Sequence, residues 1–346
     1  MHLALIVGGT AHASSIQFNP SGLLHGFWGL TVEGLTWGAI YALVAVGYTL
    51  VYGVLKLINF AHSEVFMVGM FGQYVALLAL GFTPNGNAYN EGLVTTIGYL
   101  IVAGLAAMVT SGLVALGLER VAYRPLRRRG AKPLVFLITA IGMSFVLQEI
   151  VQYVLPNLNT TPTLGGSSAQ PGIALVSPVT EFTVFGAAVR NTAIVIIISA
   201  LVLAALVDVL INRTGFGRAI RAVAQDPDAA TLMGVSRERV IMLTFLLGGV
   251  LAGAAAILYA TWQTSAIIYN GGFLLGIKAF TAAVLGGIGN VRGALLGGLL
   301  LGVFENYGAI LFGNQWKDVI AFVLLVLVLM IRPSGLLGEK LGRARA

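Results

Sequence analysis

Three polar side chains, Asn59, His62 and Glu64, stand at the start of an otherwise apolar run that extends to Leu80. Lipid penalises such groups, so each of them is expected to face protein or water. Asn59 could cap a helix, and Glu64 would then lie near the positive end of the helix dipole. His62 follows Asn59 by three residues and falls on the same helix face. The spacing indicates either chemistry local to a helix start, with a structural histidine, or a polar path through a membrane.

Other polar groups are scattered through the apolar segments. Glu33, Glu149 and Lys278 fall near segment ends, where snorkelling or local hydrogen bonds would also account for them, and Glu305 is a further intramembrane ionisable group. Tyrosines in the first apolar segment combine an apolar ring with a polar tip, which suits a mainly apolar path with sparse polar groups. The predicted path residues are Asn59, His62, Glu64, Glu33, Tyr41, Tyr48 and Tyr52.

Motifs for bond-making chemistry are missing from the sequence. None of the five lysines follows a glycine, so no G-x-x-x-x-G-K-[ST] loop can hold nucleotide phosphates. Neither H-E-x-x-H nor G-x-S-x-G occurs, and without cysteine there is no thiol nucleophile or thiolate metal site. We therefore predict no catalytic residue, no metal site and no cofactor in this chain. Any use of ATP would belong to another chain.

The elements that must position these residues are membrane helices. Of the 346 residues, 58% are hydrophobic and 10% are charged, and runs of about 20 apolar residues recur along the chain. The expected fold is an all-α, polytopic transmembrane helix bundle with eight to nine membrane segments. The nine apolar segments are 26–55, 57–81, 92–118, 133–155, 191–211, 240–261, 273–289, 294–312 and 318–332.

Basic residues set the expected orientation. Segments 119–132, 212–239 and the tail from Arg332 hold 6, 5 and 4 Lys/Arg, which is 15 of the 20 in the chain. The positive-inside rule makes all three cytoplasmic and places the N-terminus outside. Their position beside membrane segments explains the net charge of +7 without a nucleic-acid partner.

Three regions follow from this arrangement. Residues 1–25 are expected to be an external tail, and their apolar run ending in Ala11–Ala13 also resembles a short signal segment. Residues 26–335 form the transmembrane domain, and 336–346 a basic cytoplasmic tail.

Small residues recur at intervals of four along the last third of the chain. Gly289, Gly293 and Gly297 would lie on one helix face and let a neighbouring backbone approach closely. Packing within the bundle is the predicted role, and contact with another subunit or a moving face is the alternative.

The stretch GLTWGAIYALVAVGYTLVYGVLKLINFAHSEVFMVG, from Gly34 to Gly69, resembles the amino-terminal signature of LivH-type permeases of branched-chain amino-acid ABC importers. Ser63 stands where that family usually has glycine, which bears on how closely a neighbouring backbone can approach. The stretch from Gly276 to Glu305 resembles the carboxy-terminal signature. The matching residues of the first signature are Gly34, Gly38, Tyr41, Ala42, Leu43, Ala45, Gly47, Thr49, Tyr52, Gly53, Asn59, Phe60, Ala61, His62 and Glu64.

A third match lies within the basic segment 212–239. Asp228, Ala229, Ala230 and Gly234 fit the E-A-A-x-x-x-G pattern of loops that dock ABC permeases on their ATPases, with Asp in place of Glu. A short helix started by Asp226 and Pro227 and ended at Gly234 would form a compact knob, whereas an ordinary solvated basic loop is the simpler interpretation.

The resemblance implies an inner-membrane permease that moves hydrophobic amino acids inward by alternating access. It implies a complex with a second, LivM-like permease, two ATPase subunits that use ATP and Mg, and an external substrate-binding protein. Urea and short-chain amide importers have similar permeases, so the cargo stays open. An autonomous channel or secondary transporter is the alternative of a different class.

Overall fold

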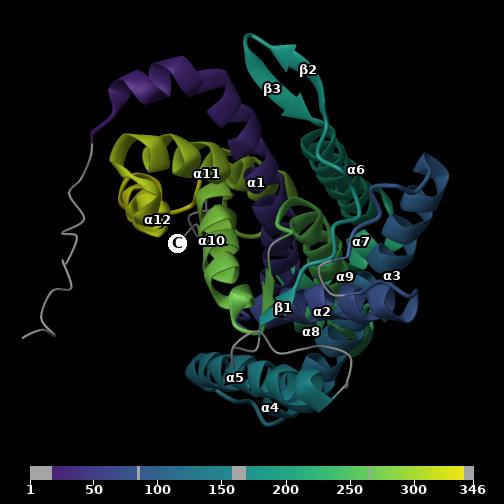
Figure 1. Cartoon of the computed structure of the whole chain (residues 1–346). Coiled ribbons are helices and arrows are strands. Elements are labelled where there is room, and N and C mark those ends of the chain that lie inside the picture. Colours follow the sequence, from purple (N-terminus) through teal and green to yellow (C-terminus); the bar gives the residue numbers. More distant parts are fainter. Residues whose placement is uncertain (1–17, 84–85, 158–168, 265, 339–346) are drawn as a thin grey trace, which may run out of the picture.

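The computed structural model describes residues 18–83, 86–157, 169–264 and 266–338, which fold into a bundle of helices (Figure 1). Each of the nine apolar segments corresponds to one helix, so the expected all-α membrane bundle is confirmed. The helices are α1 (Pro20–Leu55), α2 (His62–Ala79), α3 (Leu93–Leu118), α5 (Pro133–Asn157), α6 (Asn191–Arg213), α9 (Arg237–Trp262), α10 (Gly271–Gly286), α11 (Val291–Phe312) and α12 (Lys317–Ile331).

The number of membrane crossings is close to the expected eight to nine. Within the described residues, seven helical segments are long and apolar enough to cross a membrane. The two that fall short are α2, whose 18 residues include the polar start His62–Glu64, and α10, which has only 16 residues. Both pack between longer helices, so the bundle holds short inner helices beside full-length spans.

Helix α1 begins earlier than its apolar run predicts. Asn19 caps it by accepting a hydrogen bond from the backbone N–H of Gly22, and Pro20 occupies the first turn. The last residues of the expected tail 1–25 are therefore helical. The signal-like Ala11–Ala13 lies outside the described residues.

Short elements connect the helices. A π-helical turn, η1 (Glu119–Tyr123), and α4 (Arg124–Arg128) extend α3, whereas α7 (Gly215–Gln225) and α8 (Pro227–Leu232) join α6 to α9. A 3₁₀ turn, η2 (Asn314–Trp316), precedes α12. Strands β2 (Thr180–Val184) and β3 (Ala187–Arg190) pair antiparallel in a hairpin that projects beside α6 (Figure 1), and β1 (Ala169–Pro171) pairs antiparallel with β4 (Ala266–Ile268).

Helix α1 lies at the centre and packs against α6, α9, α10 and α11. Its contact with α11 depends on glycines in both helices, because a Cβ at Gly38 would lie 2.7 Å from the carbonyl oxygen of Gly298. Gly302 likewise abuts the backbone of Gly34. In lipid such close backbone approach provides the van der Waals contact that holds helices together.

The predicted four-residue glycine face is only partly present. Gly293 and Gly297 lie on α11 against Gly286 and Ala282 of α10, where a Cβ would overlap the opposing carbonyl oxygens. Gly289 does not pack: it lies in the turn between the two helices with φ of 101°. The prediction for Gly289 was wrong because α10 ends at Gly286, three residues earlier than expected, and Gly289 falls in the turn that follows, where a positive φ favours glycine.

Candidate functional site

The connection between α1 and α2 carries the polar motif. Helix α2 begins at His62, and the side chain of Asn59 does not cap it. The Oδ1 atom of Asn59 instead accepts a 2.6 Å hydrogen bond from the hydroxyl of Tyr123 in η1, and both residues are buried. Asn59 therefore joins two distant segments of the chain, which its helix-start spacing did not predict.

Glu64 is fully buried in the first turn of α2. Its Oε1 atom accepts hydrogen bonds from Gln148 at 2.9 Å, from Ser144 at 3.2 Å and from Ser63 at 3.3 Å. Within the part of the chain that the structure describes, Oε2 has no hydrogen-bond partner. A carboxylate with one oxygen held by three donors and the other unsatisfied can accept a cation, an ammonium group or a proton.

Two glycines of α10 bring this helix against the same site. A Cβ at Gly272 would lie 3.0 Å from Glu64 Oε2, and a Cβ at Gly276 would overlap the Cβ of Ser63. Although Ser63 stands where the family usually has glycine, α2 and α10 still approach closely here, because Gly272 and Gly276 of α10 have no side chain. Glu64 is enclosed by α2, α5 and the first turn of α10.

His62 is buried beside Tyr48 of α1, with ring centroids 4.7 Å apart in an edge-to-face arrangement. Among the described residues, its Nε2 atom has no partner. Gly47 leaves room for the imidazole, because a Cβ at this position would overlap His62 Nε2, and Gly248 of α9 lies on the other side of the ring. The histidine is thus packed between α1 and α9 with one nitrogen unsatisfied.

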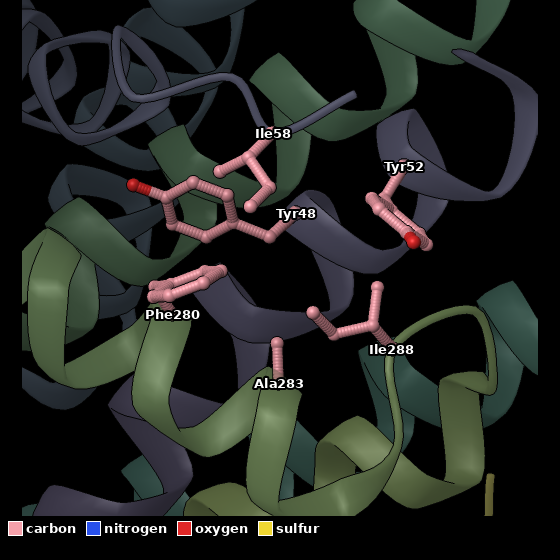
Figure 2. A pocket seen from close by; sticks show the side chains of 6 residues that line it. All are labelled: Tyr48, Tyr52, Ile58, Phe280, Ala283 and Ile288. Atoms are coloured by element: carbon pink, nitrogen blue, oxygen red, sulfur yellow. The ribbon is translucent and has the colours of Figure 1, made fainter. Parts of the chain in front are cut away.

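A small apolar hollow adjoins this histidine. It has room for about one water molecule and is lined by Tyr48, Tyr52, Ile58, Phe280, Ala283 and Ile288. Figure 2 shows the rings of Tyr48 and Phe280 on one side and that of Tyr52 on the other. Tyr48 therefore touches both His62 and the hollow, and the hollow suits an aliphatic group better than a charged one.

Tyr41 belongs to a different polar cluster. Lys278 of α10 forms 2.7 Å ion pairs with Glu305 of α11 and with Asp318 of α12. Its ammonium nitrogen lies 6.0 Å from the centroid of the Tyr41 ring. The sequence had marked Lys278 and Glu305 individually, but Asp318 was missed because it lies at the start of a predicted span, where a carboxylate needs no special explanation.

Glu33 joins neither cluster. It is half-buried on α1, fourteen residues before Gly47, which is about 21 Å along a helix. The seven predicted path residues thus divide: Asn59, His62, Glu64, Tyr48 and Tyr52 gather around the start of α2 and the hollow, whereas Tyr41 and Glu33 lie elsewhere.

The basic segment between α6 and α9 contains a compact knob formed by α8. Asp226 Oδ1 accepts hydrogen bonds from the backbone N–H groups of Asp228 at 3.0 Å and Ala229 at 2.9 Å. Gly234 ends the knob with φ of 83°, a conformation that favours glycine. Asp228 and Ala229 are exposed, whereas Ala230 is buried.

Two apolar side chains of this knob were missed by sequence reasoning. Leu232 is 89% exposed and Met233 is 84% exposed. Two large apolar residues in a short helix within a basic segment would have been enough to predict an exposed apolar contact surface. They give the knob an apolar tip beside its acidic start.

The described residues contain no group of three or more His, Cys, Asp or Glu side chains placed to hold a metal ion.

A family model and individual relatives match this chain along most of its length, and they all describe the same kind of protein. Residues 30–329 match the family described as branched-chain amino acid transport system / permease component. The chain is 42% identical over 321 residues to the high-affinity branched-chain amino acid transport system permease protein BraD of Pseudomonas aeruginosa, covering 89% of this chain and 94% of that protein. It is 39% identical over 317 residues to the corresponding protein LivH of Escherichia coli K12, with the same two coverages.

A more distant relative shows the same full-length correspondence. The probable branched-chain amino acid transport permease protein LivH of Methanocaldococcus jannaschii is 27% identical over 321 residues, covering 89% of this chain and 92% of that protein.

Proposed function

Because the chain belongs to the family of branched-chain amino-acid transport permeases, we propose that it forms the membrane pathway of an ATP-driven importer for branched-chain amino acids. It is a multi-pass membrane protein. The observation that carries the proposal is the match from residue 30 to 329, which spans the polar α1–α2 connection, the knob and the α10–α11 pair alike. The chain moves its substrate by alternating access and makes or breaks no bond in it.

Energy would come from separate ATPase subunits that bind ATP and Mg. Helix α8 supports this assignment, because its exposed Leu232 and Met233 form an apolar tip that a partner protein could cover. A second, LivM-like permease and an external substrate-binding protein would complete the complex. An autonomous channel or secondary transporter would have no use for such a docking knob, so the knob favours the ATP-driven importer.

The proposed orientation puts the N-terminus outside and the C-terminus in the cytoplasm of the inner membrane. With this orientation α8 and the basic α4 both face the ATPases, as the positive-inside rule requires. The hairpin of β2 and β3 then lies on the external side, where the binding protein would dock.

The substrate path is proposed to pass the start of α2. Glu64 Oε2 could pair with the substrate ammonium, and the apolar side chains around Tyr48 and Tyr52 could line the route of its aliphatic side chain when alternating access widens the hollow. His62 and Asn59 lie between these two positions along the chain. Weak binding is sufficient here, since a tight intermediate site would slow release and the external binding protein can supply selectivity.

Reconstitution tests both the class and the cargo. The whole complex, with its binding protein, is placed in liposomes containing ATP, and uptake of radiolabelled leucine and urea is compared. Leucine uptake that requires ATP is expected. Uptake of urea without leucine would overturn the cargo in favour of a urea or amide importer, and flux of either solute through this chain alone without ATP would overturn the importer class.

A further inference from the structure

The junction of α3 and α4 contains a π-helical turn, η1, with a buried residue at each end. Glu119 opens the turn and Tyr123 closes it. A π turn holds one residue more than an α turn and is common at functional sites. If η1 returned to α geometry, α4 would rotate by about 100° relative to α3, the angle of one residue in a helix. The turn can therefore have two discrete arrangements, one π-helical and one α-helical.

Glu119 is linked to the first turn of α9 through a buried ion pair with Arg127, which also pairs with the partly exposed Glu238. Arg127 lies 2.9 Å from Glu119 and 3.1 Å from Glu238, and Arg124 lies 2.5 Å from Glu238. The side chains of Arg127 and Glu119 are only 8% and 2% exposed. Glu238 belongs to the first turn of α9, four residues after Gly234, which ends the knob.

Tyr123, at the other end of η1, reaches the polar motif. Its hydroxyl donates the 2.6 Å hydrogen bond to Asn59, and its ring packs against Phe245 of α9 with centroids 5.3 Å apart. The turn η1 is therefore linked to two places. Glu119 connects it through Arg127 to the first turn of α9, and Tyr123 connects it to the α1–α2 connection.

From this juxtaposition we infer that Glu238, Arg127, Glu119 and Tyr123 form a relay that couples the knob to the Asn59–Glu64 connection. The inference rests on the proposed function, in which an ATPase moves α8. Movement of α8 displaces the first turn of α9, and Arg127 follows Glu238 because the guanidinium of Arg127 is buried and would lose a charged partner if the two side chains separated. The strain reaches η1, whose change of geometry moves Tyr123 and with it Asn59. These four are positioning residues that touch no substrate themselves.

The test uses the assembled complex in liposomes and measures leucine imported per ATP hydrolysed. Tyr123→Phe removes the hydroxyl and keeps the ring, and Glu238→Gln removes the charge and keeps the shape. Each is expected to lower the import-to-hydrolysis ratio by roughly two- to thirty-fold, the range of a coupling contribution between sites. The double variant should be no worse than the poorer single variant, because both changes break one relay.

Tyr74→Phe is the matched control. Tyr74 is as buried as Tyr123, but its hydroxyl has no hydrogen-bond partner in the described residues. Its loss should leave the ratio unchanged. A purely structural role for Tyr123 would reduce the amount of complex, import and hydrolysis together, with the ratio constant, and that result would overturn the relay.

Failure of the relay is distinguishable from failure of the proposed function. If the unmodified complex imports leucine with ATP and both variants keep its ratio, or the double variant loses the product of the two single effects, the relay is wrong and the importer stands. If the unmodified complex imports no leucine, the proposed function fails first.

Discussion

Lys278 and Glu305 form a 2.7 Å ion pair between α10 and α11, and Asp318 of α12 shares the same ammonium group. The lysine side chain is 15% exposed and that of Glu305 is 5% exposed. One cation therefore holds three helices, of which α12 is otherwise mostly unburied. Removing the lysine would leave a buried carboxylate unpaired in an apolar environment.

We expect Lys278→Met to destabilise the folded chain by about 3 kcal/mol, the usual cost of breaking a buried ion pair by removing one partner. Thermal unfolding in mild detergent measures the change. Lys317→Met is the matched control, because in the described residues Lys317 forms no ion pair although it lies next to Asp318. Equal stability of the two variants would contradict a structural role for the Lys278 cluster.

Glu64→Gln should lower leucine uptake by roughly tenfold or more, the scale of one lost charge-assisted hydrogen bond. Glutamine keeps the shape of the side chain and can still accept from Gln148 and Ser144, so folding should survive. Uptake per unit of assembled complex in liposomes gives the result. The loss is expected only if Oε2 meets the substrate ammonium.

Glu149→Gln controls for charge in the same region. Glu149 follows Gln148 on α5 but is exposed, and no contact of its carboxylate is needed by the proposed path. Unchanged uptake is expected. If both variants transport normally, Glu64 is a structural group that holds α5 through Ser144 and Gln148.

The helices of this bundle were predictable because each long apolar run has one solution in lipid, a helix with its backbone hydrogen bonds made internally. The site was only partly predictable. Glu64 and Lys278 were marked by their cost in lipid, yet their partners Gln148 and Asp318 come from distant helices whose approach no local spacing encodes. Tyr123 was missed for the same reason, since its link to Asn59 depends on how η1 folds against the α1–α2 connection.

The geometry of turns also limited what could be predicted from the sequence. Gly289 fitted a four-residue repeat, but the break between α10 and α11 depends on positive φ angles at Gly287 and Gly289, which a repeat of small residues does not reveal. Helix start and stop signals were more informative than the glycine repeat. The Asp226–Pro227 start and the Gly234 end of the knob have the geometry that their residue types predict.

Gly276→Ala should destabilise the α2–α10 contact by about 1 to 3 kcal/mol, because the added Cβ would overlap the Cβ of Ser63. Thermal unfolding in detergent measures it. Gly98→Ala on α3 is the control: among the described residues nothing lies within 4 Å of its added Cβ. Alanine there should be neutral or stabilise by up to about 1 kcal/mol. Equal effects at the two glycines would show that α10 does not press on Ser63.

Gly234→Val should uncouple ATP hydrolysis from transport. A β-branched residue at φ of 83° is strained by about 1 to 3 kcal/mol, which would be relieved by reshaping the end of the knob next to Leu232 and Met233. The purified complex should then retain ATPase activity but import little leucine, or lose its ATPase subunits during purification. Insertion of the chain into the membrane should be unchanged, because α8 lies outside the candidate membrane spans.

Gly130→Val provides the same kind of strain away from the knob. Gly130 follows α4 with φ of 64°, and for both glycines the described residues leave the space around an added Cβ open. If only the Gly234 variant shows a lower ratio of leucine imported to ATP hydrolysed, the knob is the point at which the ATPases act. Normal ATP-dependent uptake by the Gly234 variant would remove that assignment, and equal losses in both variants would indicate that backbone strain in any cytoplasmic turn is sufficient.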